Sequence, residues 1–388
     1  MIPYGKHYID EDDIHAVVNV LKGRTLTQGP AVEAFEVAVA QYVGAKYAVA
    51  VSSGTAALHL SYLAAGVKQG NSVVTSPITF VATANAAKYC GGDVLFADID
   101  PDTINMSPTS LKQVLSINSN VRLVTPVHFA GLPCDMVSIK ALADDAGAVV
   151  IEDAAHALGA VYPSGQRVGS CENSLMTIFS FHPVKAIAAG EGGMITTNDE
   201  AIYRRLLRLR SHGINKMDDS FQLLEQAQTA GKINPWYYEM QELGFHYRIT
   251  DIQCALGLSQ FKKLDKFIER RRNLAKKYDK FFESKKGFTI TQRSWRDLSA
   301  HHLYILRIDF SLLGISRVEL INRLRSEGII PQVHYIPVPL HPYYRRLGFD
   351  EKSIPNAMKY YEEALSIPLF FELTEYEQDF VMNSIALK

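Results

Sequence analysis

A lysine in an apolar stretch is the residue of this sequence best suited to covalent chemistry. Lys185 follows the apolar run 176–181, and no charged residue comes after it before Glu191. Lysine is rarely buried without a partner, and burial lowers its pKa, so that the neutral amine can form a Schiff base with a carbonyl. Pro183 and the glycines within 190–193 fit a loop that presents one side chain. An ordinary surface lysine on a loop would leave the same pattern.

A carboxylate closes a second apolar run. Residues 148–153 read as a buried strand that ends in Glu152 and Asp153, followed by Ala154, Ala155 and His156. Ligands bind at the carboxyl ends of parallel strands, so Asp153 can face a crevice and pair with a protonated ring nitrogen. It can equally cap the helix that follows.

Two further stretches supply smaller parts of a site. The turn 52–57, which includes Thr55 and Ala56, offers hydroxyl and backbone N–H groups at a helix N-terminus, where phosphates bind. The same residues also form an ordinary helix cap. Phe80 follows an apolar strand and can stack on a flat heterocycle, although such a phenylalanine often belongs to the core.

Alternating strands and helices are expected to position these residues. We predict strands at 48–52, 72–75, 94–98, 122–127, 148–153, 176–180 and 193–197, and helices at 55–65, 81–89 and 136–145. Apolar runs separated by helices are typical of an α/β domain with a mostly parallel sheet. The residues singled out above then gather at strand ends.

The pattern changes after residue 199. We expect a basic helix at 200–212, a long irregular segment at 215–240, and one long helix at 251–282 that connects to a smaller α+β part. That part has predicted strands at 288–291 and 303–309 and helices near 316–327, 356–365 and 374–386. The predicted domains are 1–250, which binds the cofactor, and 251–388.

Composition excludes several classes of protein. The 388 residues carry a formal net charge of -1, so neither nucleic acid nor an anionic membrane is an expected partner. No run of about 18 apolar residues suggests a membrane span, and the polar N-terminus does not resemble a signal peptide. The four cysteines are far apart, which favours neither a metal site nor disulfides and fits a cytoplasmic protein.

Together these stretches match one cofactor. Pyridoxal phosphate needs a phosphate cup, an aromatic surface, a carboxylate at its ring nitrogen and a lysine, and the sequence offers all four at strand ends. There is no Walker motif and no GxGxxG, so a dinucleotide-binding protein is not expected.

The motifs as a set resemble the DegT/DnrJ/EryC1/StrS sugar aminotransferases, which belong to fold type I of the pyridoxal phosphate enzymes. The matching stretches cover almost the whole chain: 26–29, 53–58, 77–85, 152–156, 179–185, 191–193, 210–213, 247–248, 253–257 and 333–335. Family members of this kind that are dehydratases carry His in place of the lysine, so Lys185 favours transamination. The intact Asp153–Lys185 pair argues against a non-catalytic binding protein.

The resemblance implies a role for each matching residue. Lys185 would hold the cofactor and move protons, Asp153 would pair with the ring nitrogen, and Phe80 would stack on the ring. His156 would lie near the ring hydroxyl. The phosphate contacts would come from Thr55, Ala56 and Ser180, and from Asn234 of a second subunit in a homodimer.

The resemblance also implies the substrates. L-glutamate would donate the amino group to C4 of a UDP-linked 6-deoxy-4-keto-N-acetylhexosamine, as in the pseudaminic acid branch of the family. A bacillosamine-type or dTDP-linked keto-sugar is the alternative acceptor. The residues expected to bind the nucleotide-sugar are Tyr4, Arg24, Thr25, Leu26, Thr27, His246, His334 and Tyr335. Arg24 and His334 could meet its phosphates or be plain surface residues, and some close relatives have Asn at the position of His246.

Overall fold

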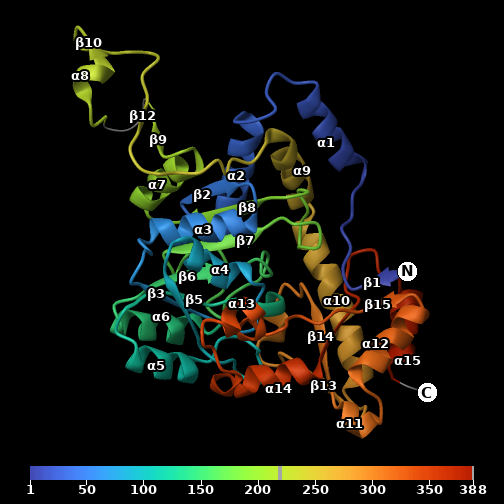
Figure 1. Cartoon of the computed structure of the whole chain (residues 1–388). Helices are drawn as coiled ribbons and strands as arrows, with labels where there is room; N and C mark the ends of the chain where they lie inside the picture. Colours follow the sequence, from blue (N-terminus) through green and yellow to red (C-terminus); the bar gives the residue numbers. More distant parts are fainter. Residues whose placement is uncertain (217–220, 387–388) are drawn as a thin grey trace.

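A seven-stranded sheet forms the centre of the computed structural model, which describes residues 1–216 and 221–386 (Figure 1). The strand order is β2-β8-β7-β6-β5-β3-β4. β8 runs antiparallel to β2 and β7, and the other neighbours pair in parallel. The strands are β2 (Tyr47–Val51), β3 (Ser72–Thr75), β4 (Asp93–Phe96), β5 (Val121–Thr125), β6 (Val149–Asp153), β7 (Met176–Ser180) and β8 (Gly193–Thr197). The predicted α/β fold with a mostly parallel sheet is confirmed.

The strands of this sheet are buried on both sides because helices cover both of its faces. Alternate residues of β6 enter different cores, with Ile151 on one face and Val150 on the other. One core is completed by α3 (Gly54–Ala64), α4 (Ala82–Tyr89) and α7 (Glu200–Arg210), and the other by α2 (Pro30–Val43), α6 (Met136–Asp145) and α9 (Asp251–Phe261). Since side chains alternate along a strand, Asp153 shares the face of Ile151, and Glu152 shares the face of Val150.

Glu152 is satisfied by the core on its own side of the sheet. It is almost fully buried, and it accepts hydrogen bonds from His128 Nε2 (2.7 Å), from Ser174 Oγ (2.5 Å) and from the hydroxyl of Tyr162. Burying a carboxylate without such donors would be costly. This network fixes the end of β6 and leaves Asp153 as the carboxylate available on the other face.

The C-terminal part has its own sheet and core. Antiparallel strands β13 (Phe288–Ile290), β14 (Tyr304–Ile308) and β16 (Ala364–Ile367) form it, and the adjoining core draws on α10 (Leu264–Phe282), α12 (Arg317–Ser326) and α15 (Glu375–Ile385). At its side, β1 (Ile2–Pro3) pairs in parallel with β15 (Ile329–Ile330), so the first residues of the chain pack against this part. The division of the chain at residue 250 stays a prediction.

The prediction of one long helix over 251–282 is wrong. The structure has two helices, α9 and α10, which are separated at Lys262 and Lys263. Lys263 has a φ of -102° and a ψ of 0°, and its ammonium lies 2.7 Å from carboxylates of both Asp10 and Asp13. The break contains neither proline nor glycine, so nothing local in the sequence marks it.

Several elements were not predicted. They are the strands β1, β15 and β16, the helices α1 (Glu11–Leu21), α2, α5 (Pro108–Ile117), α11 (Phe310–Leu313) and α13 (Pro342–Arg345), and the 3-10 turns η1 (Phe129–Gly131), η2 (Arg296–Leu298), η3 (Val338–Leu340) and η4 (Glu351–Ser353). The predicted helix near 356–365 is α14 (Pro355–Glu363), followed directly by β16. Throughout the described ranges, no helix has the length and apolar character that a membrane crossing requires.

The predicted irregular segment projects from the rest of the chain as an arm (residues 221–240, Figure 1). Residues 217–220 of the segment lie outside the described residues. Its short elements are β9 (Ile214–Asn215), α8 (Leu224–Ala227), β10 (Gln228–Thr229), β11 (Lys232–Ile233) and β12 (Glu239–Met240). β10 and β11 form a small hairpin, and β12 pairs with β9 at the base of the arm.

Asp251 caps the helix that precedes the sheet. Its carboxylate is 1% exposed and accepts hydrogen bonds from the backbone N–H groups of Gly29 (2.8 Å) and Ala31 (3.1 Å). These groups lie at the N-terminus of α2, where no helical carbonyl can accept them. We therefore expect Asp251→Asn, which removes the charge and places a donor against a donor, to lower the free energy of unfolding by about 1–3 kcal/mol in denaturant titrations. Glu269→Gln, at an exposed position of α10, is the control. Equal midpoints for the two variants would contradict this role.

Candidate active site

A cavity of about 670 Å³ opens at the edge of the sheet where the parallel strands end. Asp153 and Ser180 are the last residues of β6 and β7, and Gly193, next to the cavity, is the first of the antiparallel β8. The predicted site residues that line the cavity are Tyr4, Thr55, Phe80, Asp153, His156, Ser180, Lys185, His334 and Tyr335. Residues from both ends of the chain and from its centre thus meet at one place.

The remaining predicted residues lie outside the lining that the described residues form. They are Arg24, Thr25, Leu26, Thr27, Ala56, Asn234 and His246. Ala56 belongs to the predicted phosphate turn but is buried, and its N–H is already bonded to Ser53 Oγ at 3.1 Å. Arg24 and its three neighbours are exposed, and Thr27 bridges to Thr250 at the start of α9.

His246 and Asn234 lie further from the cavity. His246 pairs with Ser211, and its ring is 5.3 Å from that of His212. Asn234 belongs to the arm, where its backbone N–H bonds the Ala227 carbonyl and its side-chain amide bonds the Gln226 carbonyl. One chain alone therefore does not bring either residue to the cofactor cavity.

Other lining residues were not predicted as site residues. They are Ser53, Gly54, Thr79, Val81, Ala82, Thr83, Val127, Ala155, His182, Val184, Glu191, Gln332, Val333, Ile336 and His341. Most lie within a few residues of a predicted one, and the spacing of Thr79 and Thr83 around Phe80 was a signal that could have been used. His341 had no signal, because η3 brings it to the cavity through the packing of the C-terminal part.

Two glycines allow the predicted phosphate turn to form. A Cβ atom at Gly54 would lie 2.9 Å from Cβ of Ser180, and one at Gly193 would lie 2.4 Å from the carbonyl oxygen of Ser53. No side chain fits at either position without displacing the other strand. The two glycines therefore let the turn before α3 approach β7 and β8, which places the hydroxyls of Thr55 and Ser180 on one wall.

Asp153 and Lys185 face the same desolvated space. Burial raises the pKa of Asp153, while the hydrogen bonds from Thr83 Oγ1 (2.6 Å) and the Ala155 N–H (3.1 Å), and the charge of Lys185, act in the opposite direction. Burial lowers the pKa of Lys185 to about 8, against the pull of Asp153. With that pKa about a tenth of the amine is neutral at pH 7, far more than for an ordinary lysine, and the neutral form is the nucleophile.

Two buried histidines of the cavity, His156 and His334, are neutral. Burial holds the pKa of His156 well below its usual range, and Nδ1 accepts a hydrogen bond from the Ala130 N–H at 3.3 Å. Nε2 then carries the proton and donates to the Tyr335 hydroxyl at 3.2 Å. Both ring nitrogens are thus engaged within the described structure, and the Tyr335 hydroxyl keeps its own proton for a ligand.

His334 is also neutral, because burial lowers its pKa to about 3. Its Nδ1 lies 2.8 Å from the Ser366 hydroxyl, and its ring lies 4.9 Å from that of Tyr4. A neutral imidazole can bind a ligand by a hydrogen bond but not as a cation. His334 is buried and not a plain surface residue, and a contact with a phosphate, which stays a prediction, would be a hydrogen bond and not an ion pair.

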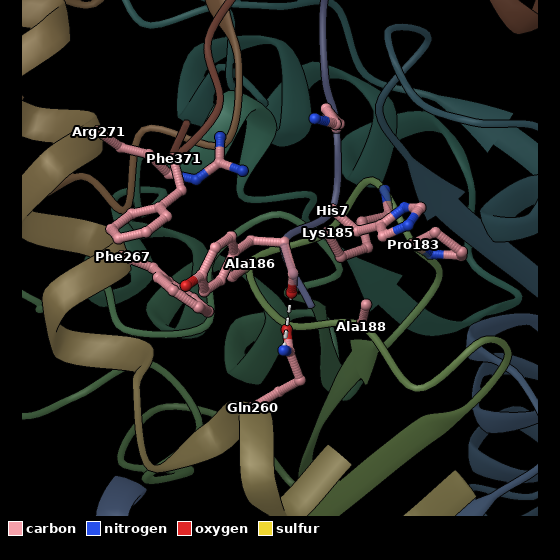
Figure 2. A pocket seen from close by; sticks show the side chains of 11 residues that line it. His7, Pro183, Lys185, Ala186, Ala188, Gln260, Phe267, Arg271 and Phe371 are labelled. Carbon is pink, nitrogen blue, oxygen red and sulfur yellow. Dashed lines mark hydrogen bonds between the residues drawn. The ribbon is translucent and has the colours of Figure 1, made fainter. Parts of the chain in front are cut away.

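On the side of Lys185 away from the larger cavity, packed side chains leave almost no empty space. Lys185 also borders a second cavity of only about 10 Å³, between residues 6–8, α9 and α10, and Figure 2 shows Phe267, Arg271 and Phe371 filling the space around it. The Gln260 amide donates to the Tyr8 carbonyl at 2.8 Å across this region (Figure 2). Such a space holds about one water molecule. A cofactor must therefore reach Lys185 from the larger cavity.

The donor set of the larger cavity fits pyridoxal phosphate. Lys185 supplies an amine, Asp153 a carboxylate whose oxygens accept hydrogen bonds, and Phe80 an aromatic ring that is 58% exposed. The turn at Thr55 and Ser180 supplies hydroxyls at a helix N-terminus for a phosphate.

Comparison with known proteins agrees with this arrangement. The family model "DegT/DnrJ/EryC1/StrS aminotransferase family" matches residues 7–386. The chain is 39% identical over 386 residues to the spore coat polysaccharide biosynthesis protein SpsC of Bacillus subtilis, covering 99% of this chain and 96% of that protein. It is 38% identical, with the same coverage, to a UDP-4-amino-4,6-dideoxy-N-acetyl-beta-L-altrosamine transaminase of Campylobacter jejuni.

Solved structures show the same fold. Helicobacter pylori PseC, an aminotransferase involved in the biosynthesis of pseudoaminic acid, superposes with a TM-score of 0.88 at 29% identity, over 99% of this chain and 98% of that one. The putative sugar aminotransferase Spr1654 of Streptococcus pneumoniae, in its PLP form, gives a TM-score of 0.88 at 28% identity, over 99% and 97% of the two chains.

The fold and the cavity thus define a fold type I enzyme that works with pyridoxal phosphate. The chain belongs to the DegT/DnrJ/EryC1/StrS aminotransferase family, and it is an aminotransferase. The roles of the individual site residues stay predictions.

The low pKa of Lys185 makes capture of the cofactor depend on pH. Only the neutral amine attacks the aldehyde, so we expect the rate of covalent attachment to the apoenzyme to rise with pH and level off above about 8. The rate is read from the absorbance change after pyridoxal phosphate is added. Lys185→Ala, which binds the cofactor without covalent attachment, corrects for titration of the cofactor itself. A corrected rate that does not change across this range would show that Lys185 is not the attacking group.

Proposed function

We propose that this enzyme transfers the amino group of L-glutamate to C4 of a UDP-linked 6-deoxy-4-keto-N-acetylhexosamine, in a pathway to pseudaminic acid. The observation that carries the proposal is the single cavity that joins Lys185 and Asp153 to a polar, aromatic mouth at Tyr4, His334 and Tyr335. The sugar acceptor is supported by the named activity of the Campylobacter jejuni relatives.

The residues around the cofactor divide the work. When bound, pyridoxal phosphate supplies a ring that withdraws electrons from the carbon losing its proton. Asp153 keeps a proton on the ring nitrogen by remaining ionised. The amine of Lys185 holds the cofactor and then carries protons between carbon atoms. Phe80 limits the tilt of the ring, while the turn at Thr55 and Ser180 binds the phosphate.

The mouth of the cavity suits a sugar. Tyr4, His334 and Tyr335 combine ring faces with hydrogen-bonding groups, and the Tyr335 hydroxyl has a proton to donate. Neutral donors and acceptors of this kind recognise sugar hydroxyl and acetamido groups. Most of the binding free energy would come from the nucleotide, which positions a small ketone against the cofactor.

A shortage of positively charged side chains around the cavity is the reason to propose a dimer. Lys185 is the only lysine or arginine among the described residues that line the cavity. A cofactor phosphate and a nucleotide diphosphate bring several negative charges, so further donors must come from elsewhere. The exposed Arg24 and the arm with Asn234 are the predicted sources.

The arm has the surface of an interface. Trp236 is 74% exposed, and Ile233, Tyr238 and Met240 next to it are also exposed. Clustered apolar side chains on a projecting segment are typical of a contact with another chain. We propose that the partner is a second copy of this chain, and that Asn234 enters its cavity.

The acceptor can be identified with purified 4-keto-sugars. We expect the enzyme to aminate the UDP-linked L-arabino 4-keto-sugar in preference to the D-xylo epimer, with glutamate consumed in equal amount, as measured by mass and proton-coupling analysis of the product. The reason for this choice is the named activity of the Campylobacter jejuni relatives, and Tyr335 and His334 at the cavity mouth would be the groups that distinguish the two faces of the ketone.

A strong preference for the D-xylo compound, or for a dTDP-linked 3-keto-sugar, would overturn the proposed substrate and leave the aminotransferase reaction standing. Bleaching of the yellow enzyme by glutamate alone is the control for the donor half of the reaction.

The shared site can be tested by mixing inactive variants. A dimer of Lys185→Ala with Asn234→Ala contains one intact composite site, so we expect activity to return after subunit exchange, towards about a quarter of the wild-type rate for random pairing. The matched control mixes Lys185→Ala with Asp153→Asn. Both changes lie in the cavity of their own chain, so no intact site can form. Equal activity of the two mixtures, with exchange proven by mass spectrometry, would count against a contribution of Asn234 across the interface.

A further inference from the structure

We infer that the hydroxyl groups of Thr79 and Thr83 form a relay that holds Asp153 as an ionised carboxylate in one orientation. Thr83 is then a positioning residue for the cofactor's ring nitrogen, an inference that rests on the role proposed above for Asp153. Neither threonine was predicted as a site residue, yet both line the cavity.

The contacts of the relay are short and buried. Thr83 Oγ1 lies 2.6 Å from Asp153 Oδ2, and Thr79 Oγ1 lies 2.8 Å from Thr83 Oγ1. All three side chains are almost fully buried, at 1% exposed for Thr83, 3% for Thr79 and 5% for Asp153. In a desolvated place a hydrogen bond to a charged group is stronger than one in water.

The hydroxyl groups of the relay can all donate in the same direction, towards Asp153. A threonine hydroxyl has one proton, and Thr83 can offer it to Asp153 at 2.6 Å or to the Phe80 carbonyl at 3.3 Å. The shorter contact, with a carboxylate, is the stronger one. Thr79 then donates to the oxygen of Thr83. Since the Ala155 N–H donates to Oδ1 at 3.1 Å, both oxygens of Asp153 receive donors. Donors on both oxygens favour the ionised form.

The relay is anchored by its backbone. Thr83 is the second residue of α4, and its carbonyl accepts a hydrogen bond from the buried Tyr62 hydroxyl at 3.0 Å. The turn 79–83 also carries Phe80, so one short segment holds both the ring proposed to stack on the cofactor and the hydroxyl that bonds Asp153. The relay thereby couples the plane of the cofactor ring to the position of its nitrogen.

Asp153 needs the hydrogen bond from Thr83 to stay ionised, because burial favours its protonated form. Burial raises the pKa of Asp153, and the hydrogen bond from Thr83 is the largest effect that lowers it. The other titratable groups that face Asp153 are Lys185, His128, Tyr62, Cys134 and Tyr335. Lys185 exerts the larger of the two charge effects that lower the pKa of Asp153, ahead of His128, and it is no longer a free amine once it holds the cofactor. The hydroxyl of Thr83 remains in both states.

The test follows the carboxylate itself. The Asp153 carbonyl band is isolated by infrared difference spectroscopy of the apoprotein labelled with 13C-aspartate, with Asp153→Asn as the blank. We expect Thr83→Val, which keeps the shape and removes the hydroxyl, to move the titration midpoint of Asp153 upward. Thr83→Ser restores the hydroxyl and should return the midpoint. Thr196→Val, which removes a buried hydroxyl bonded to the Gly169 carbonyl at 2.8 Å, should leave it unchanged.

An unchanged midpoint in folded Thr83→Val would overturn the relay. If that variant does not fold, Thr79→Val replaces it, with a smaller upward shift expected and no shift again counting against the relay.

The holoenzyme separates the relay from the role of Asp153. If the relay exists and Asp153 also pairs with the cofactor, Thr83→Val should raise the dissociation constant for pyridoxal phosphate by about tenfold. This is the equivalent of one charged hydrogen bond. A shifted Asp153 midpoint with an unchanged dissociation constant would uphold the relay and refute the pairing of Asp153 with the cofactor.

Discussion

The site depends on keeping a carboxylate and an amine in one desolvated cavity. Burial raises the pKa of Asp153 and lowers the pKa of Lys185, so the same surroundings push both groups towards their neutral forms. For Lys185 this is useful, because the neutral amine is the nucleophile. For Asp153 burial favours the protonated form, which could not pair with a protonated ring nitrogen. The hydrogen bonds from Thr83 and Ala155 lower the pKa of Asp153 and so oppose this effect. The two groups therefore need different neighbours within one cavity.

Side chains that alternate between the two faces of the sheet give neighbouring carboxylates different surroundings. Asp153 and Glu152 follow one another on β6 and enter opposite faces, so two carboxylates can be buried side by side along the chain without facing one another. Glu152 is surrounded by donors from the core, whereas Asp153 opens on the cavity. The glycines at 54 and 193 then allow the phosphate turn to approach the ends of β7 and β8. Position in the sheet, more than residue type, decides which carboxylate opens on the cavity.

Much of this arrangement could be predicted from local sequence. Strands buried on both faces leave apolar runs, and parallel strands align their ends, which is why Asp153, Ser180 and Lys185 could be assigned to one edge. What local sequence did not reveal was set by distant contacts. The break between α9 and α10 coincides with ion pairs from Lys263 to α1, and His341 reaches the cavity only through the packing of the C-terminal part. Arg24 and Asn234 lie outside the cavity of their own chain, so the contacts predicted for them cannot be read from one chain.

Trapping the cofactor is the most direct test of the central claim. Borohydride reduction of the yellow holoenzyme, followed by peptide mapping, fixes the cofactor to the lysine that carries it. The structure predicts the label on Lys185, since this amine faces Asp153 across the larger cavity. Lys6, which borders the small cavity behind the loop and pairs with Glu372 at 2.7 Å, is the nearby lysine that should stay unlabelled. Label on Lys6, or on any lysine other than Lys185, would contradict the account.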